Sequence, residues 1–225
     1  MSCALRAGEY SVTDTINETV LNDLIGKVIG DVAGALSLFM AYLGDQAGVF
    51  SALDGAGRLT LDELAAKTTL NPKYLREWLG SVCAAGYVQH HAEDETFSLM
   101  PEQALVFTRE GQPACMQGFF QLIVSQFAGH EKATETFKTG KGRPWGDHPQ
   151  CLFCGTDRFF RPGYQANLVD NWIPALDGVE AKLKAGAKVA DIGCGHGSST
   201  VLMAQAYPNS KIHGIDFHAP SIEEA

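Results

Sequence analysis

Apolar residues recur at helical spacing near the N-terminus of the chain. From Asn17 onward they fall three or four positions apart, which predicts a long amphipathic helix. Gly26, Gly30 and Gly34 recur every fourth residue within it, although glycine inside a helix costs about 1 kcal/mol relative to alanine. Such glycines on one face predict that another helix passes very close. We therefore interpret the segment as a dimer helix, with packing on its own domain as the alternative. The apolar stripe consists of Val20, Leu21, Leu24, Ile25, Val28, Ile29, Val32, Ala33 and Leu36.

Two shorter helices are predicted next by their start and stop signals. Thr60 and Glu63 have the spacing of a capping box, which opens a helix over residues 61–67. The pair Asn71-Pro72 starts a second helix, and Gly86 is placed to end it. Each helix therefore has one side that must be buried. The apolar face of the second helix comprises Tyr74, Leu75, Trp78, Leu79, Val82 and Cys83.

A β-hairpin is predicted after the second helix. Residues 87–91 and 96–100 are strand-like and flank a polar turn. Two helices followed by such a hairpin predict a winged-helix domain, a module that often binds DNA. The second helix offers Lys73 and Arg76 to phosphates, but the turn carries three acids that would repel them. We therefore favour a scaffold or dimerisation role over DNA recognition.

The pattern richest in chemistry lies near the end of the chain. An apolar strand over 188–192 runs into Gly193, Gly195 and Gly197, and a second strand ends at Asp216. Glycines let the backbone turn tightly and approach a ligand closely, and an acid about twenty residues later can bond ribose hydroxyls. The dinucleotide fingerprint would need its last glycine one residue further on. The pattern predicts a nucleoside-binding βαβ unit, with a glycine-rich turn of an NAD enzyme or another α/β domain as the alternative.

Residues 191–197 read D-x-G-x-G-x-G, which resembles motif I of the class I S-adenosylmethionine-dependent methyltransferases. Gly214-Ile215-Asp216 resembles their motif II. The resemblance implies that the glycine loop packs against the methionine part of the cofactor and that the acid holds the ribose. It also implies that Arg161 and Tyr164 could bond the methionine carboxylate or the acceptor. The cofactor-binding residues so implied are Asp191, Gly193, Cys194, Gly195, Gly197, Asp216 and Phe217, with Arg161, Tyr164 and His196 as weaker candidates.

The segment ahead of the first strand is rich in glycine, proline and aromatic residues. We expect a linker over 136–187 whose last part is a lead-in helix, Gln165 to Leu176. In similar enzymes this segment lies over the cofactor and forms part of the acceptor pocket. His148 is a candidate base because imidazole titrates near neutral pH, although we favour interdomain packing or a solvated hinge for it.

From about Asn17 onward the chain resembles methyltransferases with an N-terminal winged-helix domain. The expected fold class is α/β, with a mostly helical winged-helix domain before the first βαβ unit of a Rossmann-like sheet. We expect a flexible tail over 1–16, a winged-helix and dimerisation domain over 17–135, and the start of the methyltransferase domain over 188–225. The resemblance implies S-adenosylmethionine-dependent transfer to a small-molecule acceptor in a homodimer. The alternative is a non-catalytic dimerisation or regulatory protein.

Composition narrows the possible partners. The formal net charge of −9 argues against nucleic-acid phosphates as a main ligand. The uncharged run in the N-terminal helix, Val32 to Gly44, is shorter than the about 20 residues that span a bilayer, so we expect no membrane partner. Without a recognisable secretory signal, the six cysteines are interpreted as reduced thiols of a cytoplasmic protein. His148, Cys151 and Cys154 have zinc-like spacing, but no second pair closes a tetrahedral site, so no metal is expected.

The chain stops shortly after Asp216. Class I methyltransferases resemble a doubly wound sheet with a central first strand, whereas only two strands are predicted here. The first strand would then lack a neighbour on one side. We therefore expect a fragment of a longer protein, with little or no activity as it stands.

Overall fold

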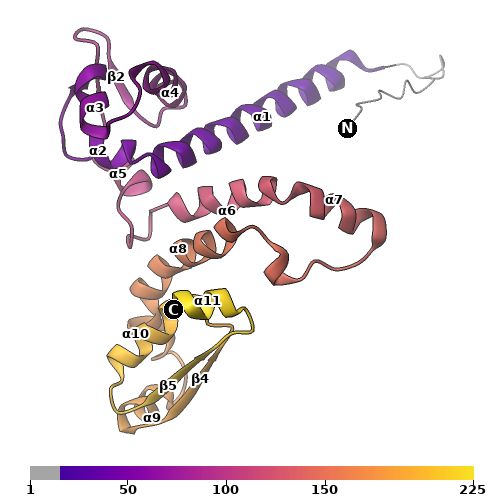
Figure 1. Ribbon diagram of the computed structural model, residues 1–225, viewed down its shortest axis with the longest axis vertical. Helices are drawn as coiled ribbons and strands as arrows, with labels where there is room; N and C mark the ends of the chain where they lie inside the picture. The colour runs from indigo at the N-terminus through magenta and orange to yellow at the C-terminus, as the bar shows by residue number, and fades with distance from the viewer. Residues whose placement is uncertain (1–15) are drawn as a thin grey trace. The chain divides into compact units, whose positions relative to one another are not determined.

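The computed structural model describes residues 16–225 (Figure 1). The tail expected over 1–16 lies, except for Ile16, outside the described residues. The chain divides into two compact units, one that ends at Leu36 and a second over Ser37–Ala225. Helix α1 (Glu18–Gln46) begins in the first unit and ends in the second.

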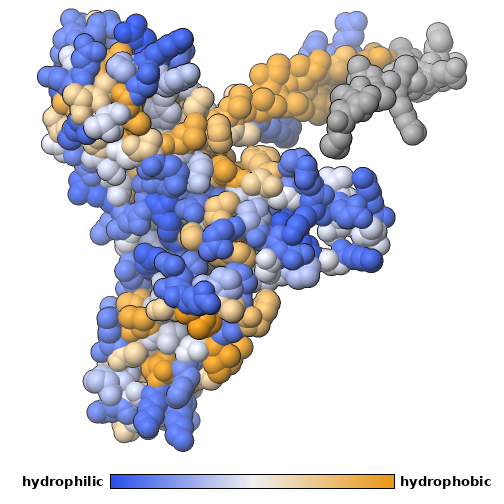
Figure 2. Space-filling model, in the orientation of Figure 1, coloured by the Kyte–Doolittle hydropathy of each residue, from blue (hydrophilic) through white to orange (hydrophobic). Residues whose placement is uncertain are grey.

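Helix α1 confirms the long helix predicted from the apolar stripe. Asn17 caps it, because its side-chain oxygen accepts the backbone N–H of Thr19 at 3.1 Å. The stripe is exposed along the first unit, where Val20 and Ile29 are each 62% exposed, and Figure 2 shows apolar side chains gathered along this helix. By length and composition α1 is also apolar enough to cross a membrane. The expectation of no membrane partner rested on the uncharged run Val32 to Gly44 alone. That run is part of α1, which has 29 residues, so the length of the run does not exclude a helix that crosses a membrane.

The winged-helix prediction is confirmed. The elements are α2 (Val49–Leu53), β1 (Leu59–Thr60), α3 (Leu61–Thr68), α4 (Pro72–Ala84), β2 (Gln89–His91), β3 (Thr96–Ser98) and α5 (Pro101–Phe107). The three strands form an antiparallel sheet in the order β1-β3-β2. The capping box is present, because the Thr60 hydroxyl accepts the N–H of Glu63 and the Glu63 carboxylate accepts the N–H of Thr60. Gly86 adopts a positive φ of 76° where the chain leaves α4.

The core of this domain is aromatic. Phe50 stacks on Phe107 with ring centroids 4.6 Å apart and meets the edge of Trp78 at 5.1 Å. The Trp78 indole N–H donates to the carbonyl of Met40 at 2.8 Å, which satisfies its polar atom inside the core. A Cβ on Gly44 would lie 2.2 Å from the Trp78 ring. Glycine at the end of α1 is therefore what lets this helix pack on the winged helix.

The segment expected to be a linker is mostly helical. It begins in the last turn of α7 (His130–Thr139). It then contains a short 3₁₀ turn (Trp145–Asp147), α8 (Gln150–Asn167), a π-helical turn (Leu168–Trp172) and α9 (Val179–Ala185). The predicted lead-in helix, Gln165 to Leu176, was therefore wrong in its bounds. Helix α8 runs side by side with α6 (Gln117–Ala128), and a Cβ on Gly118 would lie 2.4 Å from the backbone nitrogen of Phe159 (Figure 1).

The last part of the described chain is a βαβ unit, as predicted. It consists of β4 (Lys188–Ile192), α10 (Ser198–Ala206) and β5 (Lys211–Ile215), followed by α11 (Ala219–Glu224). The two strands pair in parallel, with Lys188 opposite Lys211 and Ile192 opposite Ile215. The unit packs against a small buried cluster of Ile173, Leu183 and Tyr207, of which only Tyr207 belongs to the unit itself. The expected α/β fold class is thereby confirmed.

Candidate functional site

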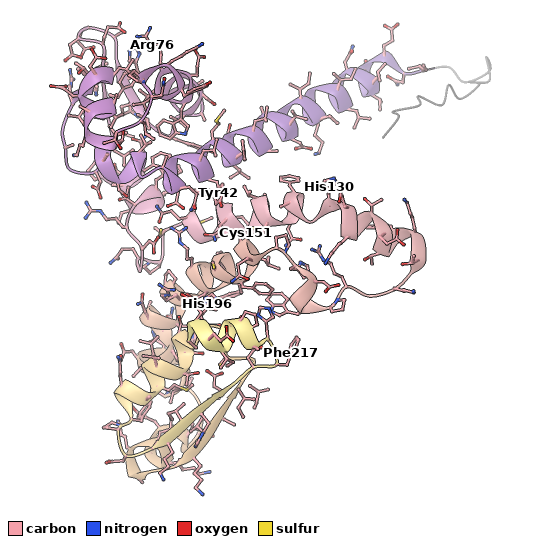
Figure 3. The ribbon with its side chains drawn as sticks, in the orientation of Figure 1. Tyr42, Arg76, His130, Cys151, His196 and Phe217 are labelled. Atoms are coloured by element: carbon pink, nitrogen blue, oxygen red, sulfur yellow. The ribbon has the colours of Figure 1, made fainter. Side chains whose placement is uncertain are left out.

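A cavity of about 420 Å³ opens at the carboxyl ends of β4 and β5. This is the end of a parallel sheet at which ligands usually bind. Figure 3 labels two of the lining residues, His196 and Phe217, one after each strand. The lining residues are Trp145, Phe153, Thr156, Asp157, Phe160, Tyr164, residues 191–196, Ser198, Ser199, Asp216, Phe217 and Ser221.

The glycine loop has the backbone that its sequence predicts. Gly193, Gly195 and Gly197 have φ values of 78°, 56° and 76°, a region that side chains with a Cβ rarely adopt. The N–H of Gly193 donates to the carbonyl of Ile215 at 2.7 Å, which ties the start of the loop to the second strand. The loop is therefore bound to both strands and leads directly into α10.

Asp216 lies against this loop. One carboxylate oxygen accepts the N–H of Gly195 at 2.9 Å, and the other accepts the N–H of His218 at 2.8 Å. The hydrogen bond from His218 has the largest effect, and together with the bond from Gly195 it holds the pKa of Asp216 below its usual value. Each oxygen keeps a lone pair for a further donor. The neighbouring Phe217 is 80% exposed and presents an open ring at the mouth of the cavity.

Asp191 and Cys194 complete the loop. One oxygen of Asp191 accepts the hydroxyls of Ser199 and Thr200 at 2.7 and 2.6 Å, which fastens the first turn of α10 to β4. Burial, and then the nearby carboxylates, raise the pKa of the Cys194 thiol. Cys194 lines the cavity, and a protonated thiol is a poor nucleophile.

Helix α8 supplies the opposite wall. This segment was expected to lie over the cofactor, with Tyr164 named as a candidate, but the helix and Asp157 were missed. Phe153, Asp157, Phe160 and Tyr164 follow one another at spacings of three and four, so they share one helical face. This periodicity was the available signal. It was hidden by Pro162 and by neighbouring glycines, which made the segment read as a loop.

Not every predicted residue reaches the cavity. Tyr164 and His196 line it, whereas Gly197, Arg161 and His148 do not. Arg161 lines a smaller neighbouring pocket and forms an ion pair with Asp157. His148 packs near Trp145, with ring centroids 5.7 Å apart, and burial lowers its pKa. The structure therefore gives His148 no direct place in the site.

The cavity is acidic and aromatic. Asp157, Asp191 and Asp216 line it, and no lysine or arginine does so among the residues described. Such a lining suits a ligand with positive charge and a flat ring. No group of three metal-ligating side chains occurs within residues 16–225, and Cys151 and Cys154 are free thiols in α8.

The possible DNA-binding face of the winged helix is mixed in charge. Arg76 lies exposed on α4 (Figure 3), followed directly by the acid Glu77. The wing carries Glu93 and Asp94, both paired with Arg58. No continuous basic surface results from this arrangement in the domain as described.

Two protein families match parts of the chain. The Rv2258c-like winged HTH domain matches residues 34–109, and a methyltransferase domain family matches residues 183–225. A curated relative, pavine N-methyltransferase from Thalictrum flavum subsp. glaucum, is 36% identical over 70 residues, which are 28% of this chain and 20% of that protein.

Solved methyltransferases share the fold. The mitomycin 7-O-methyltransferase MmcR matches 92% of this chain with a TM-score of 0.58 at 18% identity. The structure of PigF with SAH matches 90% with a TM-score of 0.54 at 14% identity. The chain spans 62% and 66% of these two structures, so it is shorter than either. These likenesses establish a common two-domain architecture.

Proposed function

We infer that this chain, which belongs to the methyltransferases that carry an N-terminal winged-helix domain, takes part in S-adenosylmethionine-dependent methyl transfer to a small molecule. One observation carries the inference. The glycine loop and Asp216 meet in a single cavity that is lined by acids and aromatic rings. S-adenosylmethionine combines a ribose, a flat base and a positive sulfonium, and each has a chemical complement in this lining.

The donor set fits the cofactor. Asp216 has free lone pairs for ribose hydroxyls, and Phe217 beside it offers a ring on which a base can stack. The space beside Gly193 and Gly195 is open, because a Cβ at either position would have no atom within 4 Å. A ligand can therefore approach the backbone of the loop closely.

The role of the chain is chiefly to position the reactants. When bound, S-adenosylmethionine would supply a methyl group: the acceptor atom would bond the methyl carbon as its bond to sulfur breaks, and S-adenosylhomocysteine would leave. Asp216 orients the nucleoside, and the apolar rings of Phe153 and Phe160 keep water from the reacting atoms. Tyr164 stays protonated at neutral pH, because burial and then Asp191 and Asp157 raise its pKa, so it acts as a hydrogen-bond donor.

Titration calorimetry with S-adenosylmethionine tests this function. Asp216→Ala removes two charge-assisted hydrogen bonds to the ribose, so we expect it to weaken binding by about 2–4 kcal/mol. Asp62→Ala is the matched control, because Asp62 is exposed on α3, away from the cavity lining. Equal affinities of the wild type and the Asp216→Ala variant would place the ribose elsewhere.

We propose a homodimer through the apolar stripe of α1. At about 100° per residue, Ile25, Val28 and Val32 fall on one side of the helix, and the glycines at 26, 30 and 34 fall about half a turn away. The large side chains of the stripe are exposed, with Ile25 at 46% and Val32 at 55%. A contiguous apolar face of this kind marks an interaction site.

Sedimentation analysis tests the dimer. Ile25→Glu puts a charge into the stripe, so we expect this variant to sediment as a monomer. Gly30→Ala lies on the glycine side of α1, about half a turn from the stripe, so this variant should stay dimeric if the stripe forms the interface. Loss of the dimer in this variant would assign the contact to the glycines. A monomeric wild type that binds phospholipid vesicles would overturn the proposal and assign α1 to a membrane.

A further inference from the structure

Asp157 is an acid of the cavity that does not belong to the βαβ unit. It lies on α8, its side chain is only 8% exposed, and it faces the glycine loop from the opposite wall. One carboxylate oxygen accepts the hydroxyl of Ser198 at 2.5 Å, and the other is paired with Arg161. An acid buried this far in a cavity wall carries a desolvation penalty that a cationic ligand would offset.

Asp216 and Asp157 bond different parts of the segment that runs from the glycine loop into α10. Asp216 bonds Gly195 in the middle of the glycine loop, beside the open ring of Phe217. Asp157 bonds Ser198, the first residue of α10. A nucleoside held at Asp216 therefore leaves the α8 side of the cavity for the remainder of the ligand.

The remainder of S-adenosylmethionine is an amino acid with one ammonium and one carboxylate. No lysine or arginine lines the described cavity. Arg161 pairs with Asp157 but does not line the cavity, and each carboxylate oxygen keeps a lone pair for the ammonium. The carboxylate has complements of another kind, namely the free N–H groups at the start of α10. We propose that Asp157 binds the α-ammonium of the cofactor and so selects ligands that carry an amino-acid end, an inference that rests on the proposed function.

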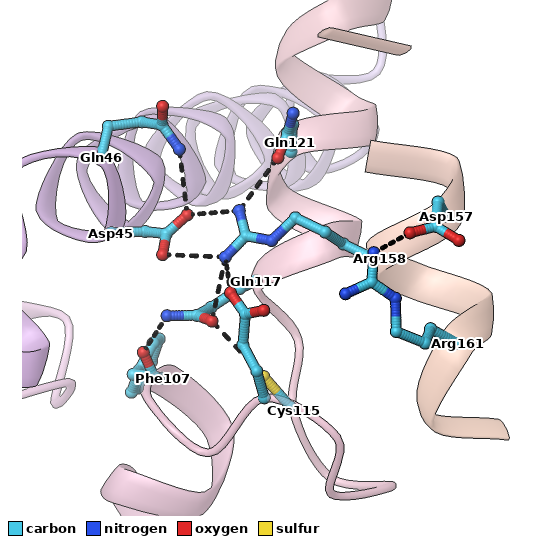
Figure 4. Close-up of polar contacts among 10 residues, drawn as sticks. Asp45, Gln46, Phe107, Cys115, Gln117, Gln121, Asp157, Arg158 and Arg161 are labelled. Carbon is cyan, nitrogen blue, oxygen red and sulfur yellow. Dashed lines mark hydrogen bonds and ion pairs between the residues drawn. The ribbon is translucent and has the colours of Figure 1, made fainter. Parts of the chain in front are cut away.

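Helix α8 holds Asp157 in a fixed position. The next residue, Arg158, turns to the other side of the helix, where its guanidinium bonds Asp45 through both nitrogens at 2.8 and 3.1 Å (Figure 4). It also bonds Gln117 at 3.1 Å and Gln121 at 2.9 Å, and it pairs with Glu110. These partners come from α1, α6 and the loop before α6.

Close packing adds to this restraint. A Cβ on Gly155 would lie 3.1 Å from the side chain of Gln121 and from the backbone nitrogen of Leu122, so α6 and α8 touch almost backbone to backbone. The carboxylate of Asp157 is thus held in place before any ligand arrives. A binding group that is already ordered loses little entropy on binding.

Calorimetry with three ligands on the 225-residue chain tests the assignment. The ligands are S-adenosylmethionine, S-adenosylhomocysteine and 5′-methylthioadenosine, which keeps the nucleoside and the thioether but lacks the amino-acid end. We expect Asp157→Asn to weaken the first two by about tenfold or more and to leave 5′-methylthioadenosine within about twofold. Equal weakening of all three ligands, or of none, overturns the proposal.

Two further variants separate binding from support of the fold. Ser198→Ala and Arg161→Gln each remove one partner of Asp157 and keep its carboxylate. We expect both to preserve the preference for ligands with the amino-acid end. If either variant loses this preference as Asp157→Asn does, the role of Asp157 is structural.

The wild-type chain supplies a test that needs no variant. S-adenosylhomocysteine should bind about tenfold or more tightly than its desamino analogue, because only the former has the ammonium. Equal affinities overturn the assignment of Asp157 and leave the nucleoside site intact. Failure of the wild type to bind any of these ligands would instead overturn the proposed function, and the inference with it.

Discussion

The winged-helix domain and the βαβ unit are held together in different ways. In the winged helix, Phe50, Leu79 and Val82 are 1%, 1% and 0% exposed, so burial of apolar side chains dominates. In the βαβ unit, Ile192 is 73% exposed and Ile215 is 49% exposed, although both lie on strands. The first region closes a core on itself, whereas strand residues of the second stay exposed, and Ile192 among them lines the cavity.

Hydrogen bonds take over where burial is weak. Asp216 and Asp191 each accept two hydrogen bonds from the residues that follow the strands, and these bonds fix the glycine loop and the first turn of α10. Because apolar burial stabilises one region and hydrogen bonds the other, mutations should act differently in the two regions. Truncated apolar side chains should damage the winged helix most, whereas loss of an acid should damage ligand binding.

The largest effect is expected from Trp78→Ala. The substitution leaves a cavity against Phe50 and removes the hydrogen bond to the carbonyl of Met40. We expect a loss of about 3–5 kcal/mol in the free energy of unfolding, measured by urea denaturation. Trp172→Ala is the control, because Trp172 is 48% exposed, and it should cost about 1 kcal/mol or less. Equal losses for the two variants would contradict the distinction between the regions.

An intermediate effect is expected where α8 meets the winged helix. Arg158→Gln leaves Asp45, whose side chain is 8% exposed, as an anion without its partner. Arg158 is charged in the native protein, because hydrogen bonds to Asp45 and Glu110 outweigh the lowering of its pKa by burial. We expect a loss of about 2–4 kcal/mol in unfolding free energy, since unpaired buried charge is strongly destabilising.

A second charge change checks the cause of that loss. Adding Asp45→Asn to Arg158→Gln removes the stranded anion, so the double variant should recover part of the stability. Arg109→Gln is the control for a more exposed pair, because Arg109 is 54% exposed where it meets Asp54. It should cost less than about 1 kcal/mol. A double variant no more stable than Arg158→Gln would show that the charge on Asp45 is harmless.

Local signals predicted the elements whose ends they define. Thr60 with Glu63, Asn71 with Pro72, and Gly86 set the bounds of two helices through backbone chemistry that a sequence reveals directly. The glycine loop was equally readable, because residues with a Cβ rarely adopt positive φ values and the loop needs them at three alternate positions. In both cases the deciding interactions lie within a few residues of one another.

Helix α8 shows where such reading fails. Its stability comes from partners far along the chain, such as Asp45, which lies 113 residues before Arg158. Gly155 looked like a helix breaker, but it is the residue that lets α6 approach. Asp157 was therefore missed, and Tyr164 was predicted without the helix that carries it. The reason is that packing overrode local propensity in α8.

The smallest effect is expected from Thr60→Ala. The substitution removes the hydroxyl that accepts the N–H of Glu63 at 3.3 Å and donates to its carboxylate at 2.9 Å. We expect a loss of about 1 kcal/mol in the unfolding free energy at pH 7, measured by urea denaturation. Thr134→Ala is the control, because Thr134 lies exposed inside α7, where its hydroxyl donates to the carbonyl of His130. That variant should stay within about 0.5 kcal/mol of the wild type.

The loss at Thr60 should also depend on pH. The backbone N–H and the hydroxyl of Thr60 lower the pKa of Glu63, so the native state favours the ionised carboxylate. This contribution is complete above the pKa of the unfolded chain and disappears as the pH falls through the lower native value. The gap between wild type and Thr60→Ala should therefore narrow in acid. A gap that stays constant from neutral pH to about pH 3 would mean that the hydroxyl caps the helix without help from the charge on Glu63.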